Sequence, residues 1–193
     1  QPCLVNYRAG SLSVAHNGNL TNAAEIKQAL VERGSIFASS SDTEVLVHLI
    51  ARSEAPDAEM QIRSALERVE GAYSLVIGVG RTLYAVVDPR GFRPLVLGRI
   101  GKGVVAASET CALDLVGATF VRELQPGEFV RITDGVVEDL QPLRARPVSR
   151  CVFELIYFAR PDSTIFGQSV DRVRREAGRR LAQAAQAYHF AFF

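Results

Sequence analysis

The stretch AHNGNLTN, residues 15–22, decides how this sequence is interpreted. It follows a short apolar run at residues 11–15 that has the period of a strand, and it leads directly into an amphipathic helix. We therefore expect Asn17 and Gly18 at a turn where a strand ends. A side-chain amide beside a glycine N–H places two hydrogen-bond donors on one piece of backbone. An oxyanion hole for an attacked carboxamide requires such a pair.

A plainer interpretation of the same residues is available. Asn-Gly is a common pair in hairpin turns, so Asn17 and Gly18 taken alone would more often be a turn than a site. The remaining motifs of the chain have to decide between the two interpretations.

Three helices are expected after this stretch. Asn22 and Ser41 are each followed three residues later by Glu, which is the capping-box pattern at a helix start. The residues after each of them, 23–33 and from Asp42 on, have the apolar period of a helix. A third helix is expected over 58–69. Asp42 would lie in the first turn, where the helix dipole favours a carboxylate.

From residue 71 on, the period of the apolar residues changes to two. Short strands are expected at 73–79, 82–87, 95–98, 104–107, 120–124, 128–133 and 136–139. Residues 144–150 resemble a linker, 151–158 one more apolar strand, and 170–187 an Arg-rich helix. Helices followed by an antiparallel meander are typical of an α+β fold with stacked layers.

The composition excludes several classes of protein. With 22 Lys+Arg against 21 Asp+Glu, no net field favours nucleic acid or an anionic membrane. No apolar run approaches the roughly 20 residues of a membrane span. Three cysteines at widely spaced positions (3, 111 and 151) do not form a disulfide framework. These features predict a cytoplasmic protein that binds neither nucleic acid nor membrane, and the Arg-rich helix is expected to be a solvated or inter-domain face.

AHNGNLTN together with SSSDTEVLVHLI (residues 39–50) resembles the glutaminase domain of class II amidotransferases, the group with an N-terminal nucleophile. Five further motifs narrow the resemblance to the amidophosphoribosyltransferases, also called glutamine phosphoribosylpyrophosphate amidotransferases. They are GAYSLVI (71–77), DPRGFRPLVLG (88–98), ASETCALDLVGA (107–118), the PGE turn (126–128) and YFARPDS (157–163). The resemblance covers roughly residues 1–183, and the closing YHFAFF departs from the family.

The resemblance implies a four-layer αββα sandwich of the N-terminal-nucleophile hydrolase type, incomplete here. Residues 1–150 would be a partial glutaminase domain that lacks its N-terminal strands and nucleophile. Residues 151–193 would be the last strand and a helix leading towards a phosphoribosyltransferase domain outside this sequence. The first residue is Gln, and Cys3 lies in a segment that matches an interior strand of the family. We therefore expect a fragment truncated at both ends.

The resemblance also implies the chemistry. In the family, an N-terminal cysteine whose α-amine is the base hydrolyses glutamine. The resemblance therefore implies that His16 is a structural hydrogen-bonding residue and not a general base. The ammonia reacts with phosphoribosyl pyrophosphate to give 5-phosphoribosylamine, the first committed step of purine (IMP) biosynthesis. By this resemblance, Asn17 (side-chain amide) and Gly18 (backbone N–H) form the oxyanion hole, and Asp42 holds the α-ammonium of glutamine. The isolated chain is expected to be inactive.

The resemblance further implies Mg²⁺ and a homotetramer for the full-length enzyme. Cys151 is a candidate ligand of a [4Fe–4S] cluster in that enzyme only, since one thiolate cannot hold a cluster. No cofactor is expected in these residues alone. Two alternatives stay open: a glutaminase fragment of another class II amidotransferase, and a non-catalytic glutamine-binding module.

Overall fold

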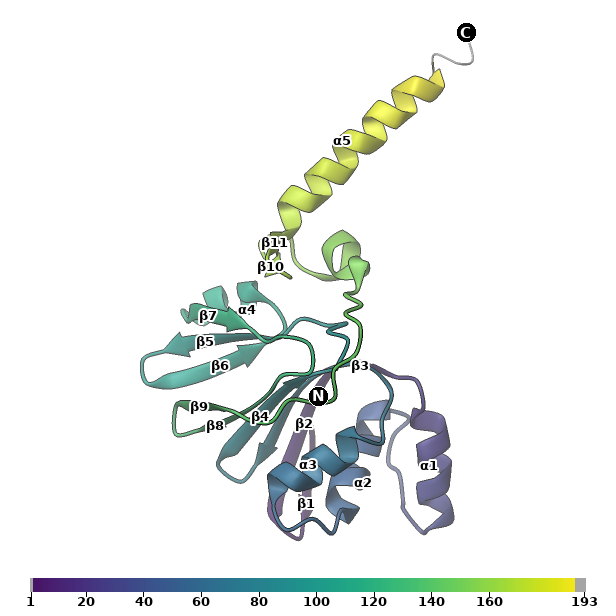
Figure 1. The fold of residues 1–193 in the computed structure, drawn as a ribbon, viewed down its shortest axis with the longest axis vertical. Coiled ribbons are helices and arrows are strands. Elements are labelled where there is room, and N and C mark those ends of the chain that lie inside the picture. Colours follow the sequence, from purple (N-terminus) through teal and green to yellow (C-terminus); the bar gives the residue numbers. More distant parts are fainter. Residues whose placement is uncertain (1, 190–193) are drawn as a thin grey trace.

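A computed structural model describes residues 2–189, with side chains up to residue 185. The last four residues of the YHFAFF end therefore lie outside the described residues. Figure 1 shows two sheets packed against each other, with helices on the outer side of each. The first sheet is antiparallel, and its strand order is β1-β2-β3-β4-β8-β9. The bounds are β1 Cys3–Tyr7, β2 Gly10–Leu20, β3 Gly71–Val79, β4 Thr82–Val87, β8 Phe129–Thr133 and β9 Val136–Asp139.

Three helices cover the outer face of the first sheet: α1 Ala23–Glu32, α2 Asp42–Arg52 and α3 Ala58–Leu66. The second sheet has the order β6-β5-β7, with β5 Val96–Ile100, β6 Gly103–Ala107 and β7 Thr119–Glu123. The short helix α4, Thr110–Leu115, packs on its outer face through Leu113. Separate apolar clusters fill the three spaces between these four layers. The expected αββα layering of an α+β fold is therefore confirmed.

The alternation of β2 separates the two faces of the first sheet. Leu12 and Val14 are fully buried in the cluster shared with the helices. His16 follows on the same face and contacts Thr43 of α2. Odd-numbered residues of β2, such as Asn17, face the second sheet because successive side chains point to opposite faces of a strand.

The strand is longer than the sequence predicted, and this corrects the placement of the central motif. Asn17 and Gly18 lie inside β2 and not at a turn. The β2–β3 ladder continues past them, and Thr21 N–H still donates to the backbone oxygen of Glu70 at 2.8 Å. Paired backbone therefore overrides the local preference of Asn-Gly for a turn.

The capping box expected at Asn22 is also wrong. Its side chain makes no bond to the first turn of α1. The amide accepts from Glu70 N–H at 2.8 Å and donates to the backbone oxygen of Arg68 at 3.0 Å. Asn22 therefore joins the start of α1 to the segment between α3 and β3. At α2 the expected cap is present, since Ser41 Oγ accepts from Thr43 N–H at 3.3 Å.

The region after residue 150 differs most from expectation. Residues 144–150 lack regular secondary structure, which agrees with the linker expected there. The strand expected over 151–158 is wrong, because Glu154–Phe158 forms a π-helix, η1. Two very short strands follow, β10 Thr164–Ile165 and β11 Gln168–Ser169, and then the long helix α5, Val170–His189.

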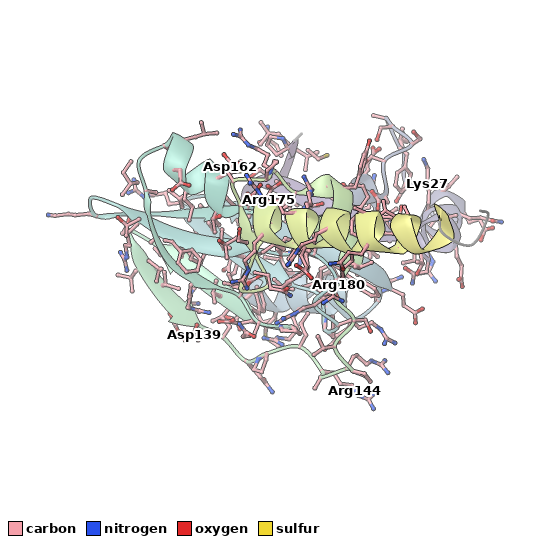
Figure 2. The ribbon with its side chains drawn as sticks, turned by 90° about the horizontal axis from the view of Figure 1, so that it is seen from above. Lys27, Asp139, Arg144, Asp162, Arg175 and Arg180 are labelled. Atoms are coloured by element: carbon pink, nitrogen blue, oxygen red, sulfur yellow. The ribbon has the colours of Figure 1, made fainter. Side chains whose placement is uncertain are left out.

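Helix α5 projects away from the layers (Figure 1). Viewed from above, Arg175 and Arg180 extend from its side (Figure 2). Both are exposed and form ion pairs within the helix, with Asp171 and Glu176 respectively. This agrees with a solvated or inter-domain face. Among residues 2–189, no helix combines the length and apolar character needed to cross a bilayer.

Candidate active site

The backbone ladder determines where the N–H of Gly18 points. Thr21 N–H donates to Glu70 at 2.8 Å and Gly80 N–H donates to Ser11 at 3.3 Å, one bond at each end of the β2–β3 pair. Hydrogen-bonded pairs alternate along an antiparallel ladder. Both bonds involve odd-numbered residues of β2, so the even-numbered residues direct their N–H groups away from β3. Gly18 is even, and its N–H therefore points to the opposite edge of β2.

Asp42 lies at this same edge. Its Oδ2 accepts a hydrogen bond of 2.9 Å from the N–H of Leu20, the next even-numbered residue. Two residues along a strand span about 7 Å. The Asp42 carboxylate therefore lies at the N–H group that follows the Gly18 N–H along this edge of β2. The fold thus brings together Gly18 and Asp42, which are separated by an entire helix in the sequence.

His16 fixes the geometry between these two residues. It is 9% exposed; its Nδ1 lies 3.2 Å from Thr43 Oγ1, and its Nε2 lies 3.4 Å from the backbone oxygen of Ala72. Burial lowers its pKa, and the positive charge of Arg93 acts in the same direction, against the opposing effect of Asp42. Near neutral pH the imidazole is therefore uncharged. This supports the structural role expected for His16.

Only glycine can occupy position 18. A Cβ there would lie 2.0 Å from the backbone oxygen of Ala72 and 2.7 Å from His16 Nε2. Those distances are far below van der Waals contact with groups that are themselves held in place. The close approach of the two strands thus explains why Gly follows Asn17 at this point.

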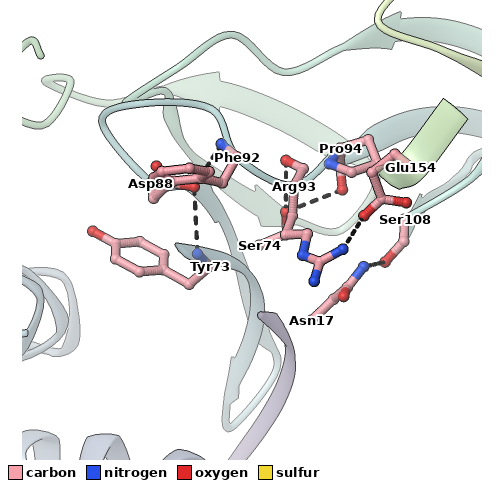
Figure 3. Close-up of polar contacts among 9 residues, drawn as sticks. All are labelled: Asn17, Tyr73, Ser74, Asp88, Phe92, Arg93, Pro94, Ser108 and Glu154. Carbon is pink, nitrogen blue, oxygen red and sulfur yellow. Dashed lines mark hydrogen bonds and ion pairs between the residues drawn. The ribbon is translucent and has the colours of Figure 1, made fainter. Parts of the chain in front are cut away.

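The side chain of Asn17 lies on the face of the first sheet opposite to His16, in the space between the two sheets (Figure 3). Its Nδ2 donates to Ser108 Oγ at 3.2 Å. Opposite Asn17 on β3 is Ser74, whose hydroxyl lies 3.0 Å from the backbone oxygens of both Arg93 and Pro94. Within the described residues, the side chains of Asn17 and Asp42 share no hydrogen bond. Strand β2 connects them, because it carries Asn17 and its Leu20 N–H binds Asp42.

A buried ion pair lies beside this cluster. Arg93 Nη1 is 2.5 Å from Glu154 Oε1, and Glu154 is 3% exposed. The Arg93 guanidinium also lies over the Phe158 ring, 4.7 Å from its centroid. Figure 3 shows the Arg93 side chain extending towards Asn17 and Ser108. The π-helix η1 is therefore joined to the neighbourhood of the motif strand.

Asp88 holds the loop that presents Arg93. Its fully buried carboxylate accepts from the N–H groups of Arg90 (2.8 Å), Phe92 (3.0 Å) and Tyr73 (3.3 Å). Burial raises the pKa of Asp88, and the backbone N–H donors oppose that rise. The loop conformation thus depends on an acid that stays in place through three charge-assisted bonds.

Sequence reasoning missed these supporting residues. Ser74, Arg93 and Ser108 lie in motifs that identified the family, and Glu154 lies just before YFARPDS, yet none was assigned a role. Ser74 and Glu154 did carry a signal, because each is a polar residue inside an otherwise apolar run, which is unusual unless the side chain has a specific partner.

The described residues do not fit a metal cofactor. Cys3, Cys111 and Cys151 are all free thiols, and Cys111 is buried. No group of three or more His, Cys, Asp or Glu side chains in the described part could hold a metal ion. Cys151 is half-buried, and its thiol alone cannot support an iron–sulfur cluster. A ligand role for Cys151 or a Mg²⁺ site would need residues outside this set.

Two antiparallel sheets between helical layers, with an HNG strand beside a helix-start aspartate, define a glutamine amidotransferase domain of the N-terminal-nucleophile type. A family profile described as "Glutamine amidotransferase domain" matches residues 1–115, and the chain belongs to that family. Among its relatives, the chain resembles the amidophosphoribosyltransferases.

Two curated relatives illustrate the similarity. The amidophosphoribosyltransferase of Staphylococcus epidermidis is 46% identical over 184 residues, covering 95% of this chain and 37% of the relative. The chloroplastic amidophosphoribosyltransferase 2 of Arabidopsis thaliana is 51% identical over 185 residues, covering 94% and 33%. The chain therefore spans only about a third of the length of these relatives.

Solved structures give the same result. The glutamine phosphoribosylpyrophosphate amidotransferase of B. subtilis, complexed with ADP and GMP, superimposes with a TM-score of 0.84 at 47% identity. It covers 88% of this chain, and the match covers 38% of that chain. A class-II glutamine aminotransferase domain protein from Silicibacter pomeroyi, 24% identical with a TM-score of 0.50, shares the fold alone.

Proposed function

We propose that these 193 residues are the glutaminase part of an amidophosphoribosyltransferase. The whole enzyme hydrolyses glutamine and transfers the ammonia to phosphoribosyl pyrophosphate, giving 5-phosphoribosylamine for purine biosynthesis. One observation carries the proposal: Gly18 N–H and the Asp42 carboxylate share one edge of the HNG strand. Phosphoribosyl pyrophosphate is proposed as the acceptor of the ammonia because the chain is 46–51% identical to amidophosphoribosyltransferases.

The proposed reaction begins when a thiolate attacks the side-chain carboxamide of glutamine. A sulfur–carbon bond forms, and the carbonyl oxygen takes up negative charge. Gly18 N–H and Asn17 Nδ2–H donate hydrogen bonds to that oxygen and stabilise the tetrahedral intermediate. The α-amine that took the thiol proton returns it to the leaving nitrogen, so collapse of the intermediate breaks the carbon–nitrogen bond and releases ammonia. Water then hydrolyses the thioester to glutamate and restores the thiol.

The nucleophile must come from outside the described residues. Cys3 lies within β1 with its side chain packed against the main core. The proposed activity therefore belongs to the longer protein. The 193-residue polypeptide by itself should release no ammonia from glutamine above background, and measurable turnover would contradict this.

Asp42 is proposed to hold the α-ammonium group of glutamine. Its side chain is 25% exposed, so it can reach a ligand while one oxygen stays bound to Leu20 N–H. The neighbouring His16 is neutral and does not compete as a cation for the carboxylate. Asp42→Asn should therefore raise KM for glutamine more than it lowers kcat.

The test uses the complete protein that contains this stretch. Glutamine hydrolysis is followed by ammonia release, and transfer by pyrophosphate release from phosphoribosyl pyrophosphate with Mg²⁺. Asn17→Ala should lower kcat for hydrolysis about 10²–10³-fold, the usual cost of removing one oxyanion donor. Asn19→Ala is the matched control, an exposed amide two residues further along β2.

Three outcomes would overturn the proposal. An unchanged rate in Asn17→Ala would remove the oxyanion role. Transfer to fructose 6-phosphate in place of phosphoribosyl pyrophosphate would favour another class II amidotransferase. Clear calorimetric binding of glutamine by the complete protein, without hydrolysis, would favour a binding module.

The homotetramer and the cofactors are proposed on the family resemblance alone. Sedimentation of the complete protein tests the tetramer, and its iron content and visible absorbance test Cys151 as a cluster ligand. Colourless, iron-free protein that retains full transferase activity would exclude that ligand role.

A further inference from the structure

We propose that Ser108 is a positioning residue that orients the Asn17 amide for catalysis. The inference rests on the proposed function and adds a residue to the same site. Ser108 lies on the second sheet's side of the site, at the bend between β6 and α4.

The first step concerns the two ends of the Asn17 amide. An amide presents NH₂ on one side and a carbonyl oxygen on the other, and only the NH₂ end can donate to an oxyanion. The hydrogen bond of 3.2 Å from Nδ2 to Ser108 Oγ occupies one of the two N–H groups. It leaves the second N–H for the substrate and opposes rotation of the amide by half a turn.

The second step concerns what holds Ser108. The next residue, Glu109, is the N-cap residue of α4, but its carboxylate does not cap the helix. Its Oε2 accepts from Arg160 N–H at 2.8 Å and from Ser163 Oγ–H at 2.8 Å. The side chain of the residue next to Ser108 is therefore bonded to residues 160–163, the loop that follows η1.

These contacts form a continuous connection from the region after residue 150 to the Asn17 amide. A displacement of residues 160–163 would move Glu109, and with it the acceptor that orients Asn17. Glu109 thus transmits the position of this loop to Ser108, and Ser108 is the residue that contacts the amide.

The experiment measures glutamine hydrolysis in the complete protein. Ser108→Ala should lower kcat about tenfold with little change in KM, less than the loss in Asn17→Ala because the donor is still present. Ser108→Thr keeps the hydroxyl and should recover most of the rate. Ser13→Ala, a half-buried serine on the same face of β2, is the control and should leave both constants unchanged.

A double-mutant cycle separates positioning from a general structural effect. If Ser108 acts through Asn17, adding Ser108→Ala to Asn17→Ala should cause no further loss. Additive losses would overturn the inference, and so would an unchanged kcat in Ser108→Ala. If Ser108→Ala does not fold, Ser108→Cys takes its place in the cycle, because its thiol is similar in shape but a much weaker hydrogen-bond acceptor.

The result also distinguishes this inference from the proposed function. Absence of glutamine hydrolysis in the unmodified protein overturns the proposed function itself. Normal hydrolysis that depends on Asn17 but not on Ser108 overturns the positioning role alone.

Discussion

The layered body and the region after residue 150 are held together in different ways. In the body, strands far apart in sequence pair with each other, and residues such as Leu75, Ile77 and Phe129 are completely buried. After residue 150, the apolar cluster consists of Ala159, Ile165 and Val170, and large apolar side chains of η1 are exposed.

Polar bonds take the place of a large core in the second region. Arg93 pairs with Glu154, and Glu109 holds Arg160 and Ser163. Burial of apolar surface stabilises a region without fixing its orientation, whereas directional bonds fix the orientation. The comparison suggests that the body provides stability and that a few polar residues determine where the C-terminal region lies.

The largest effect is expected for Phe129→Ala in the body. Phe129 is 0% exposed and packs against Tyr84, with ring centroids 5.9 Å apart. Loss of this ring should cost about 3–5 kcal/mol of unfolding free energy, measured by urea denaturation. Leu181→Ala, at a position 71% exposed on α5, should change it by less than about 0.5 kcal/mol. Equal effects at the two positions would contradict the comparison.

The second effect concerns the ion pair that joins the regions. Glu154→Ala leaves the Arg93 charge without its partner and should cost about 3 kcal/mol, expressed as local opening. Hydrogen exchange should accelerate at residues 154–165 and stay slow in β3 and β4. The exposed pair Arg160–Asp162 provides the control, and Asp162→Ala should leave exchange unaltered. Uniform acceleration across the body would show that the pair supports the whole fold.

The third test makes the same substitution in each region and expects opposite signs. Gly18→Ala places a methyl group 2.0 Å from a backbone oxygen and should destabilise the body by about 2 kcal/mol. Gly178→Ala has open space around it in α5 and should stabilise that helix by about 0.5–1 kcal/mol. Thermal unfolding and helical circular dichroism measure the pair. A tolerated Gly18→Ala would contradict the close strand approach.

The smallest effect is a pH dependence at His16. Burial holds the pKa of His16 below 6.5 in the folded chain. At a pH between this lowered pKa and 6.5, the unfolded chain therefore binds more protons than the folded one. Stability from the neutral imidazole is therefore present above pH 6.5 and declines as the pH falls below it. His16→Asn should flatten the stability curve between pH 7.5 and 5.5, relative to the unmodified chain. A steeper curve in the variant would reverse the assigned sign.

Local periodicity was enough to predict most of the body. The second helix and the strands 82–87 and 136–139 lie where the sequence placed them, because each has a clear apolar period and a defined boundary. The αββα layering followed from family motifs and not from periodicity. Helix α4 was missed, since six residues are too few to show a helical period.

Contacts between distant segments explain the rest. Asn17 and Gly18 were placed at a turn because the apolar run ends before them and a helix follows, and the ladder with β3 shows that the strand continues. The apolar run at 151–158 was expected to be a buried strand, yet Tyr157 is 77% exposed in a π-helix. An apolar run does not reveal what covers it. The partners of Ser108 and Glu154 could not be predicted for the same reason.

One consequence follows from the alternation of β2. A slip of this strand by a single residue would turn Asn17 towards the helices and His16 towards the second sheet, and it would expel Leu12 and Val14 from the core. Damage to the chemistry and damage to the packing are therefore inseparable for this kind of error. Any chain whose β2 is correctly packed also has the Asn17 side chain on the side of the second sheet.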